Sequence, residues 1–150
     1  MSVTAAIDLA SALAFASQNP VCWLATSVGG QPHVRGLLMW FADQTGFYFH
    51  TGTVKPLSDQ LLANPRVEVA FHNPGKGPGD GRMMRVSGAV ERVHDDKLEA
   101  RLIRERVWLS DMVAAQKSGT LFLFRIPHGE ILDWTMATNL HEREQVPLRF

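Results

Sequence analysis

The sequence contains one cysteine, no excess of charge of either sign and no long run of apolar residues. The lone Cys22 rules out an internal disulfide and a zinc site built from thiolates, and it fits a reducing compartment, so we expect a cytoplasmic protein. Fifteen Lys and Arg residues balance fifteen Asp and Glu residues, which argues against a nucleic-acid binder and requires any anionic ligand to be held locally. No stretch reaches the roughly 18 apolar residues of a membrane-spanning helix, so we expect a soluble protein without a membrane partner.

The length of the chain and its first residues indicate one domain that starts with a helix. With 150 residues and 45% hydrophobic content, residues 1–150 suffice for a single domain with a sizeable core. The N-terminal segment lacks the basic region of a signal peptide, and an amphipathic pattern begins at Ile7. Ser2 or Thr4 is the expected cap of a helix that runs to about Gln18.

Short strand-forming segments dominate the rest of the chain, separated by glycine, proline or asparagine. The expected strands cover residues 21–27, 32–41, 47–51, 67–72, 82–93, 121–126 and 130–135. Short helices are expected at 56–63, 95–108 and 111–117. Strands joined mostly by tight turns, without regular alternation of strand and helix, argue against a doubly wound nucleotide-binding sheet. They predict an α+β chain built on an antiparallel barrel or sandwich with short flanking helices.

Side chains that bind anions gather around the predicted hairpin of residues 32–51. If Phe41 and Phe47 flank its turn, antiparallel pairing sets Arg35 opposite Thr53, and directly opposed residues share a face. The same register places Thr51 on this face as well. A phosphate site is therefore indicated in outline.

Lys55 extends the cluster, because it lies where Pro56 opens a helix whose first N–H groups are free to bind an anion. The same spacing also fits Arg35 and Lys55 as the solvated ends of a hairpin. A register slip of one residue would turn Arg35 away from the threonines. Both interpretations remain open at this point.

The chain resembles the pyridoxamine 5'-phosphate oxidase-like family of FMN-binding split barrels over roughly residues 21–93, with weaker agreement from residue 121 onward. The resemblance rests on the run PHVRGLLMWFADQTGFYFHTGTVKPLSDQLLANPRVEVAF, followed by RVSGAVERV. It implies an antiparallel split barrel of six or seven strands and FMN as the cofactor. It also implies a homodimer with FMN at the subunit interface.

The resemblance implies a set of cofactor-binding residues. Arg35 and Lys55 match positions that bind the FMN phosphate, and Thr51 and Thr53 would add hydroxyl groups. Along the flavin ring, the resemblance places the backbone of Gly36, Leu37 and Leu38 and the side chain of His50.

Further contacts would come from strand 82–93 and from the C-terminal segment. Two subunits build each site in such proteins, so Met83 and Arg85 would reach the flavin of the partner subunit. Trp134 and Asn139 belong to a segment similar to the one that packs on the flavin in the oxidases. Trp134 as a plug of the barrel is an equally open interpretation.

Two departures from the oxidases concern the reaction. Trp40 stands where the oxidases have a lysine on the cofactor, and Asn139 directly precedes Leu140 where they carry an extra arginine for the substrate. The resemblance therefore extends to the broader family, and oxidation of pyridoxine 5'-phosphate does not follow from it.

The remaining motifs point to no other chemistry. The six histidines show neither H-x-H nor H-E-x-x-H spacing, so no metal site is expected, and the loop 73–81 lacks the Ser or Thr of a P-loop. Since a flavin carries the redox chemistry itself, no catalytic side chain is expected. We expect an oxidoreductase that passes electrons from a reduced nicotinamide to a small organic acceptor or dioxygen. A non-enzymatic flavin carrier or redox sensor, or a split barrel that binds deazaflavin or haem, are the alternatives.

Overall fold

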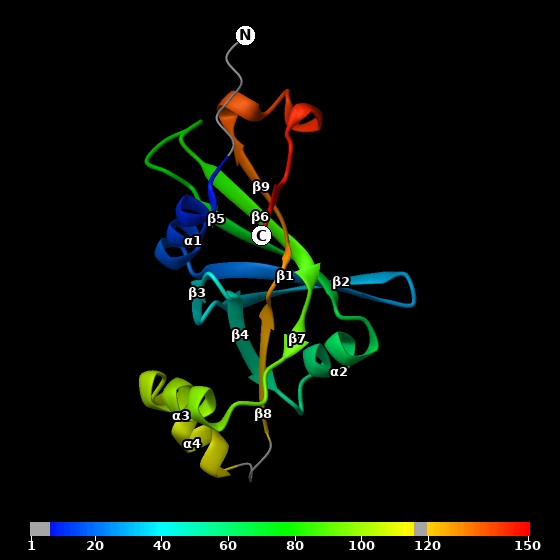
Figure 1. Cartoon of the computed structure of the whole chain (residues 1–150), viewed down its shortest axis with the longest axis vertical. Helices are drawn as coiled ribbons and strands as arrows, with labels where there is room; N and C mark the ends of the chain where they lie inside the picture. The colour runs from blue at the N-terminus through cyan, green and yellow to red at the C-terminus, as the bar shows by residue number, and fades with distance from the viewer. Residues whose placement is uncertain (1–6, 116–119) are drawn as a thin grey trace.

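Two antiparallel sheets form the centre of the fold, as Figure 1 shows for the computed structural model of the chain. The structure describes residues 7–115 and 120–150. The larger sheet consists of β1 (Val21–Val28), β2 (Gln31–Leu38), β5 (Arg66–Asn73), β6 (Arg82–Ala89), β9 (Gly129–Thr135) and β10 (Leu148–Arg149), in the order β10-β9-β6-β5-β1-β2. The smaller sheet consists of β3 (Phe41–Asp43), β4 (Gly46–Gly52), β7 (Glu91–Arg92) and β8 (Leu121–Ile126), in the order β3-β4-β8-β7.

Short helices flank the sheets, so the predicted α+β fold of antiparallel strands is confirmed. They are α1 (Leu9–Gln18), α2 (Pro56–Ala63), α3 (Asp96–Glu105), α4 (Trp108–Ala115) and the 3-10 turns η1 (Met136–Thr138) and η2 (Glu142–Glu144). Figure 1 shows α3 and α4 at one end of the molecule, and η1 and η2 at the opposite end. None of the helices within the described ranges combines the length and apolar character needed to cross a bilayer.

Helix α1 begins later than its sequence suggests. Asp8 is its N-cap, and the Asp8 carboxylate accepts a hydrogen bond from the Ser11 amide at 2.7 Å. The expected caps, Ser2 and Thr4, lie outside the described residues. Similarly, the helix expected at 95–108 ends at Glu105, and a separate helix begins at Trp108. Residues 116 and 117, the expected end of the last helix, also lie outside the described ranges.

Two of the expected strands are each divided between the two sheets. The strand expected at 82–93 ends at Ala89 in the larger sheet and resumes at Glu91 in the smaller one. The strand expected at 32–41 ends at Leu38, and Phe41 begins β3. Apolar residues span both points at which the chain changes sheets, which is why the sequence suggests one strand in each case.

The register expected for the hairpin of residues 32–51 is wrong. Arg35 pairs with Leu24 of β1, and Phe41 pairs with Tyr48 instead of flanking the turn opposite Phe47. The Thr53 amide donates to the Thr120 carbonyl at 2.8 Å. Because the chain changes sheets between Leu38 and Phe41, no ladder connects Arg35 to Thr53.

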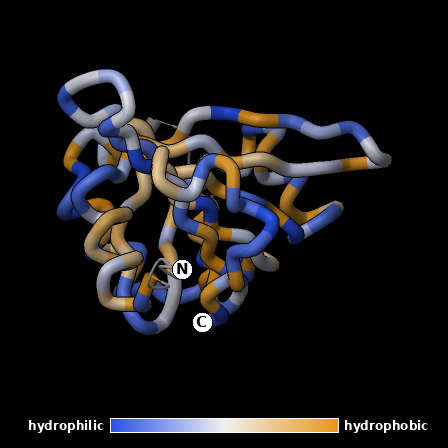
Figure 2. The backbone as a smooth tube through the Cα atoms, turned by 90° about the horizontal axis from the view of Figure 1, so that it is seen from above, coloured by the Kyte–Doolittle hydropathy of each residue, from blue (hydrophilic) through white to orange (hydrophobic). Residues whose placement is uncertain are grey.

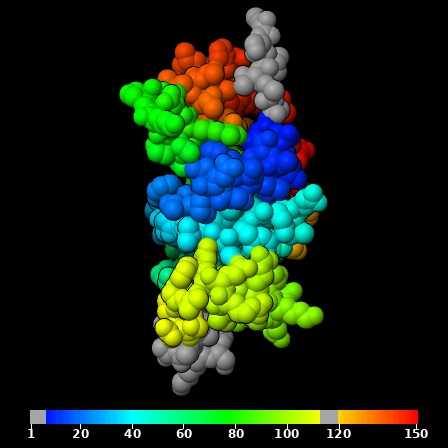
Figure 3. Space-filling view, turned by 90° about the vertical axis from the view of Figure 1, so that its left-hand side faces the viewer, coloured from blue at the N-terminus to red at the C-terminus, as the bar shows by residue number. Residues whose placement is uncertain are grey.

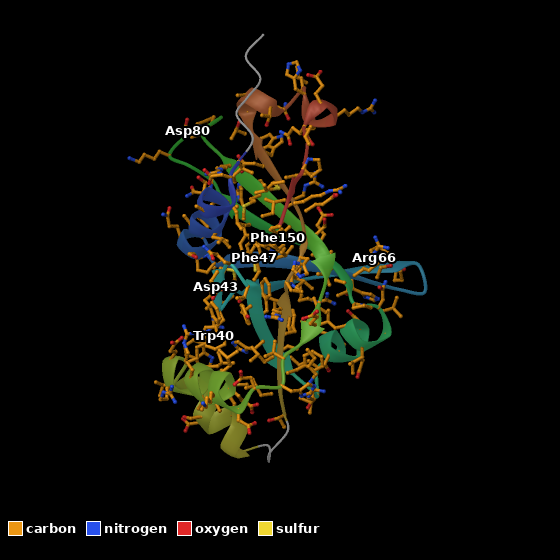
Figure 4. All side chains as sticks on the ribbon, viewed as in Figure 1. Trp40, Asp43, Phe47, Arg66, Asp80 and Phe150 are labelled. Carbon is orange, nitrogen blue, oxygen red and sulfur yellow. The ribbon has the colours of Figure 1, made fainter. Side chains whose placement is uncertain are left out.

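The hydrophobic core lies between the two sheets, beneath α1 and α2. Figure 2 shows hydrophobic and hydrophilic residues interspersed along the chain. In β5, buried residues alternate with more exposed ones, as expected when one face of a strand is buried, whereas most of β4 is buried. Phe49 and Phe124 are fully buried and stack with their ring centroids 5.5 Å apart. Phe47 packs edge-on against Phe150 at 5.4 Å, and Figure 4 shows the two side by side in the middle of the molecule.

A second, smaller core fastens α3 and α4 to the small sheet. Leu102, Leu109 and Leu123 are its buried members. Trp40 joins them from the β2–β3 corner: its indole N–H donates to Glu105 Oε2 at 2.7 Å, and the Arg101 guanidinium lies 5.1 Å from its ring centroid. Figure 3 shows the α3–α4 segment against the β3–β4 region, and Figure 4 shows Trp40 next to this segment. Trp40 therefore helps to hold α3 against the small sheet.

Candidate functional site

A cleft of about 370 Å³ opens where the ends of β2 and β4 meet the α3–α4 segment. Its walls include six of the residues predicted from the sequence: Gly36, Leu37, Leu38, His50, Thr51 and Lys55. The structure thus brings together residues of two different sheets and of the start of α2. The volume of the cleft falls within the usual range of small-molecule sites.

The loop between β4 and α2 has a defined conformation at the edge of this cleft. Ser58 is buried, and its hydroxyl donates to the carbonyls of Thr53 and Lys55 at 3.0 and 2.8 Å. The Lys55 amide donates to the Gly52 carbonyl at 3.0 Å. Lys55 is the N-cap of α2 but makes no side-chain capping bond, and its side chain is exposed. Its ammonium group is therefore available to an anion in the cleft.

Arg35 does not line this cleft. Its guanidinium donates to the Leu24 carbonyl at 3.2 Å, to Thr26 Oγ1 at 2.9 Å and to Gln60 Oε1 of α2. Burial lowers the pKa of Arg35, and these three bonds fasten α2 to β1 and β2. Thr53 also lies outside the lining of the cleft. Of the four residues predicted to bind the phosphate, Thr51 and Lys55 line the cleft, and Arg35 and Thr53 do not.

A second pocket, of about 280 Å³, lies at the β6–β9 pair of the larger sheet and is lined by Met83, Arg85 and Trp134, three further predicted residues. Met83 and Trp134 are directly opposed in the β6–β9 ladder. Arg85 makes an ion pair with Glu68 at 3.0 Å. Asn139 lines neither pocket and is exposed at the end of η1.

Arg106 lines the cleft and was not among the predicted residues. The sequence places it at the end of a charged segment, Glu91 to Arg106, whose composition is typical of a solvated helix face. Arg106 is instead only 8% exposed. It is the C-cap of α3 and lies between the buried Leu102 of α3 and the buried Leu109 of α4.

The Arg106 guanidinium binds the turn between β2 and β3 and the end of β4. It donates to the carbonyls of Leu38 at 3.2 Å and Met39 at 2.8 Å, and one Nη1–H also meets Nε2 of His50. Since arginine has no acceptor, Nε2 of His50 accepts this bond, and in the neutral ring the proton resides on Nδ1. Burial, and then the positive charges of Arg106 and Lys55, lower the pKa of His50 to about 4. At neutral pH, His50 is therefore an uncharged hydrogen-bond donor.

The lining of the cleft is thus mostly apolar and carries positive but no negative charge. Leu37, Leu38, Trp108 and Leu109 provide apolar surface. Two cations, Lys55 and Arg106, line it, and there is no Asp or Glu among the described residues of its wall. Such a site is suited to a planar, partly apolar ligand that carries negative charge.

Comparison with known proteins identifies the family. A family model described as "Pyridoxamine 5'-phosphate oxidase" matches residues 10–133. The chain therefore belongs to the pyridoxamine 5'-phosphate oxidase family.

Among curated relatives, the "Pyridoxine/pyridoxamine 5'-phosphate oxidase" of Ralstonia pickettii (strain 12J) is 37% identical over 71 residues. The match covers 47% of this chain and 32% of that relative. The chain thus spans about a third of the length of this curated relative.

Solved structures show the same fold at low sequence identity. A NimC/NimA family protein from Clostridium acetobutylicum superposes with a TM-score of 0.72 at 22% identity, over 95% of this chain and 90% of that one. An FAD-binding protein from Mesorhizobium loti superposes with a TM-score of 0.60 at 23% identity, over 85% and 94%. HutZ, the heme storage protein from Vibrio cholerae, gives 0.62 at 17% identity, over 85% and 93%. These similarities establish the split-barrel fold.

Proposed function

We propose that this protein binds FMN in the cleft at the ends of β2 and β4. The observation that carries the proposal is the convergence of Gly36, Leu37, Leu38, His50, Thr51 and Lys55, which the family resemblance had assigned to the flavin, on one cleft. The positive charge of the lining supports an anionic ligand. The FAD-binding protein from Mesorhizobium loti, which shares this fold, supports a flavin ligand.

Lys55 and the start of α2 are the proposed centre of phosphate binding. Lys55 provides a mobile cation, Thr51 a hydroxyl group, and the N-terminus of α2 the positive end of the helix dipole. Arg35 and Thr53 remain in the proposed phosphate site on the strength of the resemblance. The bonds from Arg35 to Thr26 and Gln60 give Arg35 an additional role, because they hold α2 in position.

A second copy of the chain is the proposed occupant of the outer face of the larger sheet. Val21, Trp23, Val34 and Leu38 are between 43 and 68% exposed on this face. Trp23 pairs with Gly36, and Val21 pairs with Leu38, so these side chains share one side of the β1–β2 hairpin. Large exposed apolar patches mark interaction surfaces.

In the proposed dimer each subunit completes the site of the other. The pocket of Met83, Arg85 and Trp134 lies on the larger sheet, which also carries the apolar patch of β1 and β2. Met83, Arg85, Trp134 and the exposed Asn139 would then contact the flavin of the partner subunit. We treat residues 1–150 as one domain and the protein as cytoplasmic within this proposal.

The proposed activity is that of an FMN-dependent oxidoreductase, with a reduced nicotinamide as electron donor and a small organic molecule or dioxygen as acceptor. Bound FMN supplies the redox chemistry. The residues of this chain bind the phosphate, orient the ring along Leu37 and Leu38, and exclude water through Trp108 and Leu109. A non-enzymatic flavin carrier or redox sensor remains the second candidate, because no side chain of the cleft is required as a catalyst.

The absorption spectrum of the purified protein, followed by titration with FMN and with haem, tests the proposal. A flavin spectrum, or saturable uptake of FMN, is expected. Haem uptake without FMN uptake would instead favour haem storage, the function of HutZ. Oxidation of NADH or NADPH with several acceptors separates an enzyme from a carrier, and a flavin-loaded protein without any turnover would contradict the oxidoreductase.

A further inference from the structure

Arg106 is a buried cation without a carboxylate partner in the described structure. Burying a charge is costly unless it is paired and hydrogen-bonded. The adjacent acid, Glu105, is exposed and engaged elsewhere, with Arg101 at 2.7 Å and with the indole of Trp40. Glu105 attracts Arg106 from a distance, without an ion pair among the described residues, and the groups that contact the guanidinium are two carbonyls, His50 and the ring of Trp108, 5.7 Å away.

The guanidinium of Arg106, a residue of the cleft wall, retains unused hydrogen-bond donors. Its described hydrogen bonds use two N–H groups of Nη1 and one of Nη2. Arginine has five N–H groups, so one on Nε and one on Nη2 have no hydrogen-bond partner among the described residues. Arg106 is thus a buried cation in the wall of the cleft. Three hydrogen bonds hold its guanidinium, and two of its N–H groups are unused within the described structure.

His50 gives the same end of the cleft a second fixed donor. Its Nε2 is occupied by Arg106, which directs the proton of the neutral ring to Nδ1. Within the described residues, the bond with Arg106 is the one hydrogen bond recorded for the imidazole. The ring lines the cleft, so Nδ1–H is available to a ligand.

We propose that Arg106 and His50 together stabilise the negative charge that the flavin ring gains on reduction, and so raise the reduction potential of the bound cofactor. This inference rests on the proposed function. Reduction adds electron density to the N1 and C2-oxygen region of the ring, and a fixed charge or donor near it tunes the cofactor. A preorganised cation in a poorly solvated wall acts more strongly than one in water.

The test is the midpoint potential of the FMN-loaded protein and of three variants. Arg106→Met removes the charge with similar volume, Arg106→Lys retains it, and Arg104→Met removes an exposed charge two residues earlier, in α3, as a control. For Arg106→Met, the preference for reduced over oxidised FMN should fall by about tenfold or more, which lowers the potential by about 30 mV for a two-electron couple. Arg106→Lys should retain most of the wild-type potential, and Arg104→Met all of it. Equal potentials for Arg106→Met and the wild type would overturn the proposal.

A measurement on the wild type covers the case in which Arg106→Met does not fold. The reduced flavin of the loaded protein should lose its N1 proton at a lower pH than free reduced FMN, as followed by its absorbance. Loss at the same or a higher pH would also overturn the proposal. A wild-type protein that binds no FMN would contradict the proposed function itself, so the two failures are distinguishable.

Discussion

At the scale of single residues, Cys22 is an inert thiol. It is fully buried in β1, its Sγ lies 3.5 Å from the Leu37 carbonyl, and burial raises its pKa to about 12. Because the thiolate is the reactive form, a disulfide reagent at pH 8 should modify the native protein at least about 100-fold more slowly than the unfolded chain. Stopped-flow absorbance measures both rates. Rapid modification of the native protein would show that β1 opens readily.

His50 is expected to make the stability of the protein dependent on pH. The pKa of its imidazole is 6.5 in an ordinary setting but about 4 in the folded chain. The unfolded chain therefore binds a proton first as the pH falls, and the free energy of unfolding decreases between about pH 6.5 and pH 4. Above pH 6.5 this contribution to stability is fully present.

Urea unfolding at pH 7, 5.5 and 4.5 measures this effect. His50→Gln keeps an acceptor for Arg106 but does not titrate, so its stability should fall less steeply over the same interval. Asp8 and Glu105, whose pKa values are lowered by hydrogen bonds, titrate in both proteins and cancel in the comparison. Identical pH profiles for the two proteins would contradict the assignment of a depressed pKa to His50.

At the scale of elements, the end of the β6–β9 pair, where Gly88 is opposite Gly129, requires glycine. A Cβ on Gly129 would lie 1.9 Å from the Ser87 carbonyl oxygen, which belongs to the backbone and cannot move away independently. Gly129→Ala should therefore lower the free energy of unfolding by at least about 1–3 kcal/mol, as for other overpacked sites. Gly77→Ala is the control, because the nearest atom to its Cβ is a side-chain oxygen of Asp80 at 3.6 Å. Equal stability of the two variants in urea would contradict the close approach of Gly129 to the backbone of β6.

The sequence predicted the positions of the strands and helices better than it predicted which strands pair. Periodicity located the strands, since alternation of buried and exposed residues is a local property. It did not show that β2 pairs with β1 and ends at the corner near Met39, because sheet switching depends on contacts between distant segments. The expected pairing of Arg35 with Thr53 failed for that reason.

The candidate site could be predicted from the sequence only in part. Leu37, Leu38, His50 and Lys55 converge on one cleft although the hairpin register was wrong, since the family resemblance did not depend on that register. Arg106 escaped prediction because it lies 56 residues from His50 in sequence and in a charged segment. Only the docking of α3 and α4 on the small sheet brings it to the cleft.

At the scale of the whole molecule, the proposed dimer depends on the apolar face of β1 and β2. Trp23 is 47% exposed at its centre. Trp23→Glu should convert a wild-type dimer into a monomer, because association would bury an unpaired charge. It should also weaken FMN binding if the partner completes the site. Light scattering after size-exclusion chromatography measures the mass.

Leu62→Glu serves as the control for the dimer, because Leu62 is 65% exposed on α2. This variant should keep the wild-type mass. A monomeric wild-type protein that binds FMN fully would contradict the shared site, and an unaltered dimer of Trp23→Glu would place the interface elsewhere.

The affinity for FMN of wild-type protein and of Lys55→Ala, measured by fluorescence titration, tests the central claim most directly. The Lys55 side chain lines the cleft and makes no capping bond, so Lys55→Ala should weaken FMN binding by about tenfold or more without loss of stability, as expected for a charge-assisted phosphate contact. Lys76→Ala, in the exposed loop 73–81, should bind as the wild type does. Combining Lys55→Ala with Arg35→Ala should abolish binding. Full FMN affinity in a folded Arg35/Lys55 double variant would contradict the proposed site.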